Sequence, residues 1–349
     1  MSETGLLTRA PGCAVLFGGT GFIGSFFARY LVDGGHFQRV YLVDRQPLAA
    51  IASTWRRAQL SGDPAITFIA ADVREPLAWV PPEPVALIGN FAAVHREPGH
   101  ADAEYYDTNL RGAEQVCAWA VRVGCTRIVF TSSISPYGPG TSRRDEQSLP
   151  VPATAYGGSK LVAEHIHRAW QAGDARRRLV IARPGVVFGP GEGGNVSRLV
   201  RAVLGRYFVY TGNRATRKAG IYVRELCAAL WWALERQDAE EEAVILFNAT
   251  LYPAPALADY VAAICAVAGV ERRVPSVPCR ALLAAGWLLD LVARPLGIAH
   301  PFSPVRIRKL VAANDIVPAY LLAQGYPFRY TLETALADWR ATCPEEWQR

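Results

Sequence analysis

The sequence predicts an α/β fold, in which a doubly wound parallel sheet is followed by a smaller C-terminal region. Three observations support this prediction. Strand-like and helix-like segments alternate through the first half of the 349 residues, a glycine-rich turn follows the first strand, and the alternation loosens after Arg183-Pro184. Alternating strands and helices are typical of a parallel sheet that carries helices on both faces.

The elements follow from short apolar runs and from the residues that end them. Residues 13–17 form an apolar run that ends in glycines, which is typical of a buried parallel strand. The helix expected over 22–32 stops at Gly34-Gly35, and the second strand, 40–43, ends at Asp44. Further strands are expected at 66–70, 85–88, 127–131 and 179–182, and further helices at 101–123 and 155–171.

The second half of the chain has a looser pattern. Helices are expected at 196–204, 222–235 and 257–268, and a strand at 243–247, without a repeat or a low-complexity linker. We therefore divide the chain into a Rossmann-type domain over 1–190 and a mainly substrate-binding region over 191–349. The second region is expected to pack on the carboxyl edge of the sheet, where open α/β sheets bind ligands.

Composition and charge limit the kinds of partner. The net charge of +6 is modest and typical of a solvated surface, so we expect no nucleic-acid partner. The seven scattered cysteines, without a CxxC pair, indicate reduced thiols in a cytoplasmic protein rather than a disulfide frame or a metal site. Residues 1–11 lack the features of a signal peptide. Because Asp290 and Arg294 interrupt the apolar stretch 281–298, we expect no membrane association.

A glycine turn between the first strand and the first helix predicts a dinucleotide site. Gly18, Gly21 and Gly24, with Phe22 and Ile23 between them, form a GxxGxxG turn. Glycines let the chain turn sharply and let backbone N–H groups approach a pyrophosphate at the positive end of the helix.

The ends of the next strands complete the predicted cofactor site. Asp44 lies 20 residues after Gly24, where a carboxylate accepts from both ribose hydroxyls and repels a 2′-phosphate. It favours NAD over NADP, although Arg45 beside it can stack on adenine or meet a 2′-phosphate. Asp72 and Val73 are expected near the adenine. Ala92 and Ala93, in the segment 90–93, are expected beneath the pyrophosphate and ribose.

A tyrosine and a lysine predict the catalytic chemistry. Tyr156 and Lys160 are four residues apart on a predicted helix and therefore share a face. A nearby ammonium lowers the pKa of a phenol, which then serves as a general base or acid. Ser133, at the end of the fifth strand, is placed to hold a substrate oxygen by a hydrogen bond, and Ser135 follows it.

Together these pieces resemble the extended short-chain dehydrogenase/reductase superfamily, in its NAD-dependent epimerase/dehydratase group. The resemblance implies that Ser133, Tyr156 and Lys160 are the catalytic triad and that Lys160 also holds the nicotinamide ribose. It further implies a supporting role for Asn109, a cofactor contact at Pro184, and a homodimer through helices that include 101–123 and 155–171. The matching segments are 18–24, 72–74, 131–138, 156–160 with Glu164, and 183–191.

The departures from the family's patterns narrow the chemistry. A dehydratase resembling the family would carry an Asp-Glu pair where Ile134 and Ser135 stand, so dehydration is disfavoured. Sugar-nucleotide epimerases usually carry an asparagine where Val186 stands, and this departure counts against a sugar-nucleotide substrate. A group of basic residues that could bind a diphosphate counts in favour of a sugar-nucleotide substrate. Arg306 and Arg308 are weaker candidates for the same contact. These basic residues are Arg214, Arg217 and Lys218.

We expect an NAD-dependent epimerase that acts on a nucleotide-linked sugar through a transient keto intermediate. Its substrate contacts would be Ser133, Ser135, Tyr156 and Arg217. The alternative is an NAD(P)-dependent dehydrogenase or ketoreductase of a sugar or of a 3β-hydroxysteroid-like secondary alcohol. A non-catalytic NAD-binding protein on the same fold is a third reading, since fold alone does not fix function.

Overall fold

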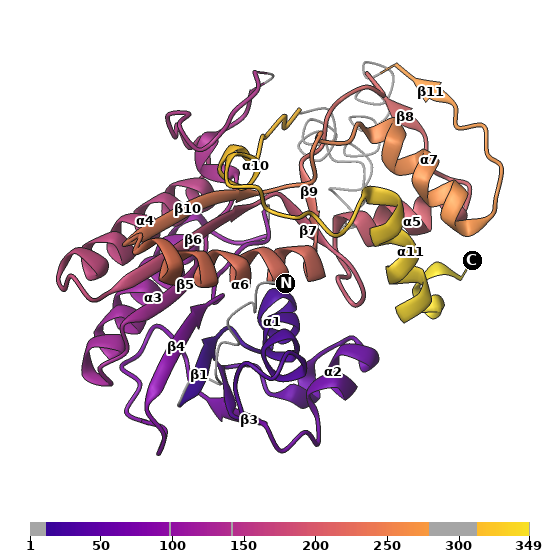
Figure 1. Ribbon diagram of the computed structural model, residues 1–349. Coiled ribbons are helices and arrows are strands. Elements are labelled where there is room, and N and C mark those ends of the chain that lie inside the picture. Colours follow the sequence, from indigo (N-terminus) through magenta and orange to yellow (C-terminus); the bar gives the residue numbers. More distant parts are fainter. Residues whose placement is uncertain (1–11, 98, 141, 279–312, 349) are drawn as a thin grey trace, which may run out of the picture.

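A parallel sheet forms the centre of the computed structural model, which describes residues 12–97, 99–140, 142–278 and 313–348. Seven strands of the described chain run parallel in the order β10-β6-β5-β4-β1-β2-β3 (Figure 1). The predicted doubly wound sheet is thereby confirmed. The strands are β1 (Cys13–Phe17), β2 (Val40–Asp44), β3 (Ile66–Ala70), β4 (Val85–Asn90), β5 (Arg127–Thr131), β6 (Arg178–Pro184) and β10 (Val244–Ala249).

Both faces of this sheet are buried, which explains why its strands read as continuous apolar runs. Successive side chains of a strand point to opposite faces. In β1, Ala14 and Leu16 join one core cluster, whereas Cys13, Val15 and Phe17 join the other. The first cluster lies under α1 (Phe22–Asp33) and α6 (Val223–Glu240), and the second lies under α3 (Asp102–Arg122) and α4 (Ala155–Ala172) (Figure 1).

The chain returns to the sheet after residue 190. Strand β10 pairs with β6 along its whole length, and α6 packs against α1 and β6. These two elements therefore belong to the Rossmann part of the molecule, although they come late in the sequence. The hydrophobic run and the helical period predicted both elements, but they carried no information about the neighbours that each would find.

The other elements after β6 form a second group. Helices α5 and α11 both pack against α7 (Figure 1), and two short parallel pairs, β7 with β9 and β8 with β11, lie outside the main sheet. Two short elements before β3 also went unpredicted, η1 (Leu48–Ala50) and α2 (Thr54–Leu60). The later elements are β7 (Val186–Phe188), α5 (Asn195–Leu204), β8 (Tyr210–Thr211), β9 (Gly220–Tyr222), α7 (Leu257–Ala268), β11 (Ser276–Val277), α10 (Ala319–Ala323), α11 (Leu332–Thr342) and η3 (Pro344–Trp347).

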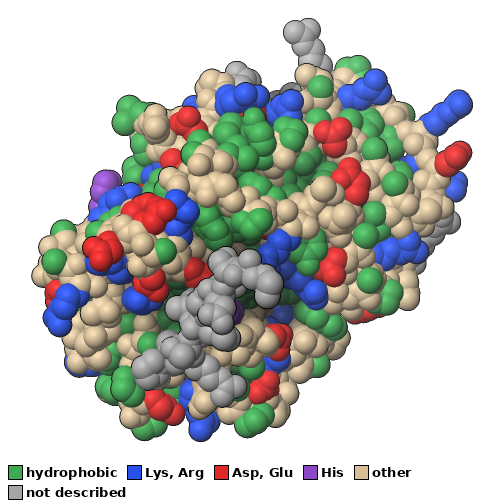
Figure 2. All heavy atoms as spheres, viewed as in Figure 1, with side chains coloured by type: hydrophobic (Ala, Val, Ile, Leu, Met, Phe, Trp, Pro, Cys, Tyr) green, Lys and Arg blue, Asp and Glu red, His purple; other side chains and the backbone are tan. Residues whose placement is uncertain are grey.

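Surface charge is mixed on the face that Figure 2 presents, where Lys and Arg side chains alternate with Asp and Glu instead of gathering into one patch. Among the described residues, no helix has the length and apolar character needed to cross a bilayer. The apolar stretch 281–298, with Asp290 and Arg294, and the basic candidates Arg306 and Arg308 lie outside the described residues, as does the N-terminal segment 1–11.

Candidate active site

The strand order creates a ligand site at one edge of the sheet. After β1 the chain builds β2 and β3 on one side, and β4, β5 and β6 follow on the other. Ligands of open α/β sheets bind at the carboxyl ends of the strands, where the order reverses in this way. The predicted cofactor and catalytic residues follow the carboxyl ends of β1 to β6, so the fold collects them at this edge.

The glycine turn lies at the centre of this edge. Gly18 has a positive φ of 70°, and its N–H donates to the Val43 carbonyl at 2.9 Å. A Cβ on Gly18 would lie 2.5 Å from the backbone nitrogen of Ala92, and one on Gly24 would lie 2.4 Å from the Gly18 carbonyl oxygen. Only glycine fits at these two positions, because the segment after β4 and helix α1 both approach the turn closely.

The N-terminus of α1 fits a dinucleotide pyrophosphate. The helix begins directly after Gly21, no side chain caps it, and its first turn carries no acidic residue. Its first N–H groups and its positive dipole end are therefore available to an anion. Phe22 and Ile23 form the start of this first turn.

Asp44 is held beside the glycine turn. Its carboxylate accepts hydrogen bonds from the backbone N–H of Thr20 at 3.3 Å and of Gln46 at 3.1 Å. The residue is half-buried at the end of β2, whereas Arg45 is exposed. A carboxylate fixed at this place can accept from ribose hydroxyls, so the geometry fits the residue's predicted role.

The segment after β3 contributes one polar and one apolar group. The Asp72 carboxylate accepts from the Arg74 guanidinium at 2.7 Å, and this hydrogen bond, with a smaller contribution from the charge of Arg45, holds the pKa of Asp72 below its usual range. Val73 packs into the core beneath α3, where its side chain lies 3.0 Å from the position of a Cβ on Gly112. The electrostatic effect of Arg45 on Asp72 indicates that the two predicted adenine-side residues lie near each other.

Asn109 joins the segment after β4 to α4, the predicted catalytic helix that carries Tyr156 and Lys160. Its buried amide accepts from the Val94 N–H at 2.9 Å and donates to the Val94 carbonyl at 3.1 Å. It also donates to the Ser159 hydroxyl at 2.9 Å, and that hydroxyl donates to the Tyr156 carbonyl at 2.9 Å. One side chain therefore fixes the backbone of both segments, and Ser159 is a site residue that the sequence reasoning missed.

Tyr105, on α3, makes a second connection between the segment after β4 and the start of α4. Its hydroxyl donates to the Arg96 carbonyl at 2.5 Å, and its ring centroid lies 6.0 Å from that of Tyr156. Asn109 and Tyr105 thus hold the backbone on either side of His95. Desolvation by the surrounding protein, with a smaller contribution from the nearby Lys160 ammonium, lowers the pKa of this histidine. Tyr105 lies one helical turn before Asn109, and this spacing was the signal that could have revealed it.

Lys160 is almost completely buried. It is 2% exposed, its Nζ donates to the Thr131 carbonyl at 2.7 Å, and it lies 4.7 Å from the centroid of the Phe130 ring. Burial lowers the pKa of Lys160 to about 7, and the charge of Glu164 opposes this shift. The ammonium is thus present below this value and is lost as the pH rises through it.

Tyr156 and Ser133 lie together at the end of β5. Burial raises the pKa of Tyr156 to about 12, while a hydrogen bond with Ser133 opposes the shift and the charge of Glu97 adds to it. The Ser133 hydroxyl also donates to the Ser135 hydroxyl at 3.1 Å and accepts from the Ser135 N–H at 3.1 Å. In this structure burial, rather than the Lys160 ammonium, dominates the pKa of the phenol.

The residues after β6 fall into two groups. The Pro184 carbonyl accepts from the Ile134 N–H at 3.1 Å, so the end of β6 supports the turn that carries Ser133. Arg217 instead donates to the Ala254 carbonyl at 2.6 Å, and its Nε lies 3.9 Å from Oδ2 of Asp315. The described contacts of Arg217 therefore do not include the Ser133, Tyr156 and Lys160 group.

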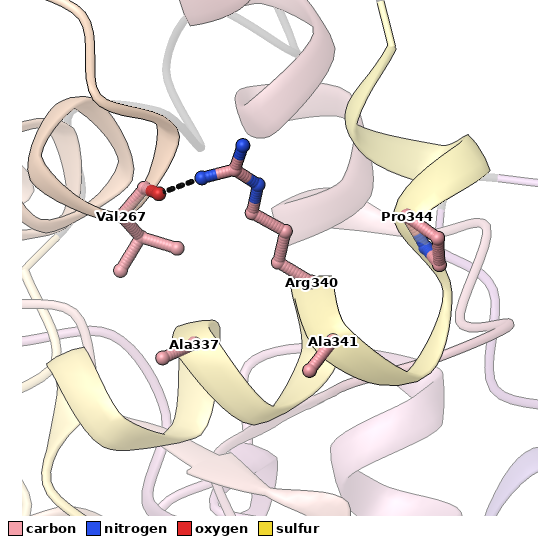
Figure 3. Close-up of a pocket in the computed structure, with 5 residues that line it drawn as sticks. All are labelled: Val267, Ala337, Arg340, Ala341 and Pro344. Carbon is pink, nitrogen blue, oxygen red and sulfur yellow. Dashed lines mark hydrogen bonds between the residues drawn. The ribbon is translucent and has the colours of Figure 1, made fainter.

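One cavity adjoins the start of α4, the helix that carries Tyr156 and Lys160. Its volume is about 500 Å³, and it lies between the segment after β4, α3 and the start of α4. It is lined by Glu97, Asp102, Tyr106, Pro152, Ala153, Thr154, Ala155 and Gly158. A second cavity, of about 310 Å³, lies between α7 and α11, where Arg340 donates to the Val267 carbonyl (Figure 3). Neither lining includes a predicted site residue.

Known proteins with similar sequences and structures include sugar epimerases. N-acetyl-alpha-D-glucosaminyl-diphospho-ditrans,octacis-undecaprenol 4-epimerase of Escherichia coli O157:H7 is 29% identical over 249 residues, which is 70% of this chain and 74% of that protein. UDP-glucuronic acid 4-epimerase from Bacillus cereus, solved in complex with NAD, superposes with a TM-score of 0.71 at 16% identity over 96% of this chain and 100% of that one. At this identity the structural match supports the fold alone.

Other relatives differ in coverage. The UDP-glucose 4-epimerases that the chain matches align over about half of their own length. A protein of Synechocystis named "Putative dihydroflavonol 4-reductase" is 27% identical over 348 residues, which is 93% of both chains. The model of the NAD dependent epimerase/dehydratase family matches residues 14–246, more than half of the sequence. The chain therefore belongs to the NAD dependent epimerase/dehydratase family.

Proposed function

We propose that the protein is an NAD-dependent epimerase that acts on a nucleotide-linked sugar through a transient keto intermediate. The proposal is supported by the hydrogen bond between Ser133 and Tyr156, by Lys160 one turn further along the same helix, and by the uncapped N-terminus of α1, which fits a dinucleotide. The epimerases among the relatives support it, because their names specify 4-epimerisation of sugars carried on a diphosphate.

The cofactor would be held by groups from the carboxyl ends of β1, β2, β3, β4 and β6 and from helices α3 and α4, with Asp44 favouring NAD over NADP. When bound, the nicotinamide would accept a hydride from a sugar carbon and return it. Arg45, Asp72 and Val73 would surround the adenine, and Lys160 would donate to the nicotinamide ribose. The proposed cofactor residues are Gly18, Gly21, Phe22, Ile23, Gly24, Asp44, Arg45, Asp72, Val73, Ala92, Ala93, Asn109, Tyr156, Lys160 and Pro184.

The protein's own part in the chemistry is proton transfer and positioning. Tyr156 would remove the proton of a sugar hydroxyl as the carbon is oxidised, and would return it after the keto sugar has turned in the pocket. Ser133 and Ser135 would hold the sugar oxygen, and Asn109 would keep the helix and the segment after β4 in register. Arg217 would reach the diphosphate with its planar fork.

We further propose that residues 1–190, completed by the packing of α6 and β10, form the cofactor-binding domain, and that most of 191–349 binds the substrate. A homodimer through α3 and α4 is supported by three apolar side chains that these helices leave exposed. They are Tyr106 at 40%, Val121 at 53% and Val162 at 40% exposure. A cytoplasmic location is supported by the six free cysteines of the described chain, five of which are buried.

A second candidate is a net reductase or dehydrogenase of a secondary alcohol. The Synechocystis relative favours it, because that alignment covers nearly all of both chains. An epimerase returns its cofactor to the starting state in each turnover, whereas a reductase consumes NAD(P)H in proportion to product. Cofactor stoichiometry therefore separates the two candidates.

The test begins with native mass spectrometry and an absorbance spectrum of the purified protein, before and after addition of a panel of sugars. The panel includes nucleotide sugars and one polyprenyl-diphosphate sugar, because the name of the Escherichia coli relative specifies a lipid carrier. We expect interconversion of two epimers without net NADH production. Production of NADH in step with product, or a protein that ignores every diphosphate sugar, would refute the epimerase proposal.

Tyr156→Phe tests the assigned base directly. We expect turnover to fall by two to four orders of magnitude, roughly the contribution of general acid–base catalysis, while NAD still binds. Tyr207→Phe is the matched control, because this tyrosine is 69% exposed and belongs to no part of the site. Full activity in Tyr156→Phe would overturn the assignment.

A further inference from the structure

We propose that Glu164 is a positioning residue for the reaction, which holds Ser133 in place through Arg183 and Ser132 and places its carboxylate one helical turn from Lys160. The inference rests on the proposed function, because it gives Glu164 a role through two residues of the assigned triad. Glu164 and Arg183 occur in segments that match the family, but the assignment of the triad gives neither of them a task.

The geometry is that of a buried, bidentate ion pair. Arg183 Nε donates to Glu164 Oε1 at 2.8 Å, and Arg183 Nη2 donates to Oε2 at 2.6 Å. The Ser132 hydroxyl donates to the same Oε1 at 2.5 Å. Glu164 is 2% exposed, Arg183 is 4% exposed and Ser132 is 3% exposed, so water does not compete for these bonds. Such pairs have strong geometric specificity, because two parallel hydrogen bonds fix both planes.

These bonds lock the segment that carries Ser133. Glu164 belongs to α4, Arg183 to β6, and Ser132 follows β5 directly. The backbone adds to the lock, because the Ser132 N–H donates to the Ala182 carbonyl at 2.7 Å and the Ile134 N–H donates to the Pro184 carbonyl at 3.1 Å. Ser133 lies between the two anchored residues. The position of its hydroxyl is thereby tied to the catalytic helix as well as to the sheet.

The same carboxylate acts on Lys160, which lies one helical turn before it. Burial disfavours the ammonium, and Glu164 is the group whose charge raises the pKa of Lys160. Glu164 also neutralises the Arg183 guanidinium, which lies 4.8 Å from the centroid of the Tyr137 ring. Removal of the carboxylate would therefore withdraw a favourable charge and leave an uncompensated cation in the same buried region.

The other titratable groups around Lys160 do not replace this charge. His167, on the same helix, stacks on Phe130 with ring centroids 4.1 Å apart, and burial lowers its pKa to about 4. Burial also lowers the pKa of His95, from the segment after β4, and raises that of Tyr156. All three groups are neutral near pH 7, so Glu164 is the charged group of the described chain that supports the ammonium.

The test compares Glu164→Gln and Glu164→Asp with the parent protein and with Glu225→Gln. Glu225 is the matched control, since this carboxylate on α6 is fully buried and accepts from Tyr326, Arg329 and Tyr330. For each protein we measure thermal stability, the NAD dissociation constant across pH, and turnover across pH. The NAD measurement reads the charge of Lys160 without any substrate.

In Glu164→Gln we expect the pH above which NAD binding weakens to fall by about one unit, as for loss of a nearby opposite charge. We also expect kcat to fall about tenfold or more with a smaller change in KM, because Ser133 is misplaced. Glu164→Asp should recover part of both effects. Glu225→Gln should lose stability but keep the pH midpoint and kcat.

If the pH midpoint of NAD binding is unchanged in Glu164→Gln, or shifts equally in Glu225→Gln, the inference is overturned. If Glu164→Gln does not fold, Glu164→Asp and Ser132→Ala carry the test. Ser132→Ala keeps the ion pair, so it should lower kcat without moving the midpoint, and unchanged kcat would overturn the positioning of Ser133. A shifted NAD midpoint in a protein that epimerises no sugar would support the role of Glu164 while refuting the proposed function.

Discussion

Replacement of Asn109 by alanine tests whether the active site depends on a connection between two segments. The side chain makes three hydrogen bonds, to the N–H and carbonyl of Val94 and to the hydroxyl of Ser159. A net value of about 1 kcal/mol for each bond gives a loss of roughly 3 kcal/mol in the free energy of unfolding. We expect this loss to appear as a melting temperature several degrees lower.

The activity should fall by more than this loss of stability explains. Without the connection, the segment after β4 and the start of α4 can shift by fractions of an ångström against each other, and misplacement on that scale costs about one to two orders of magnitude in kcat/KM. Turnover is measured well below the melting temperature, so that every variant is folded in the assay. NAD affinity is measured alongside, because Ala92 belongs to the same segment.

Gln237→Ala is the control for this experiment. Its buried amide on α6 donates to the carbonyls of Leu179 at 3.1 Å and Ala243 at 3.2 Å, away from the predicted site residues. It should lower the melting temperature without reducing kcat/KM. If Asn109→Ala and Gln237→Ala lose stability to a similar degree and both keep full activity, the view that Asn109 positions the catalytic helix is refuted.

Two further predictions concern the ligands. Asp44→Asn should reduce the preference for NAD over NADP by about tenfold, because a charge-assisted hydrogen bond is lost and repulsion of a 2′-phosphate disappears; an unchanged ratio of dissociation constants would assign the preference to Arg45. Arg217→Ala should weaken the binding of a nucleoside diphosphate sugar. Asp315→Asn should strengthen this binding up to roughly fivefold, because it frees Arg217 and Arg143 from their shared carboxylate. Unchanged dissociation constants in both variants would leave the basic stretch as a solvated surface.

The central strands could be predicted because most of them are apolar and buried along nearly their whole length. A strand of five apolar residues buried on both faces leaves a clear run in the sequence, as Cys13–Phe17 does. The short elements leave no such trace. Strand β7 (Val186–Phe188) has only three residues and pairs with β9, far along the chain, so its stability comes from tertiary contacts. Helix α2 carried one local signal, its N-cap Ser53.

In the candidate site, too, pairs within one helix could be predicted from the sequence, whereas contacts between separate elements could not. The spacing of Tyr156 and Lys160 placed them on one face of a helix, and the same spacing from Lys160 to Glu164 could have drawn attention to the carboxylate. The partner of Glu164, Arg183, comes from a strand, and no pattern in the sequence links the two. Arg217 is a clearer case, since its described partner Asp315 lies beyond the undescribed stretch 279–312.

The charges of the catalytic group explain why its supporting residues matter. Burial raises the pKa of Tyr156 and lowers that of Lys160, so both shifts favour the neutral forms of the two side chains. Two neutral groups are cheaper to bury than an ion pair, which fits a site enclosed by protein. The proposed proton abstraction from a sugar hydroxyl needs the opposite state, a phenolate beside an ammonium. Ser133 lowers the pKa of the phenol and Glu164 raises that of the lysine, so these two residues move the pair in the same direction. Glu164 also holds the segment that carries Ser133, and one carboxylate therefore supports both sides of the proposed proton transfer.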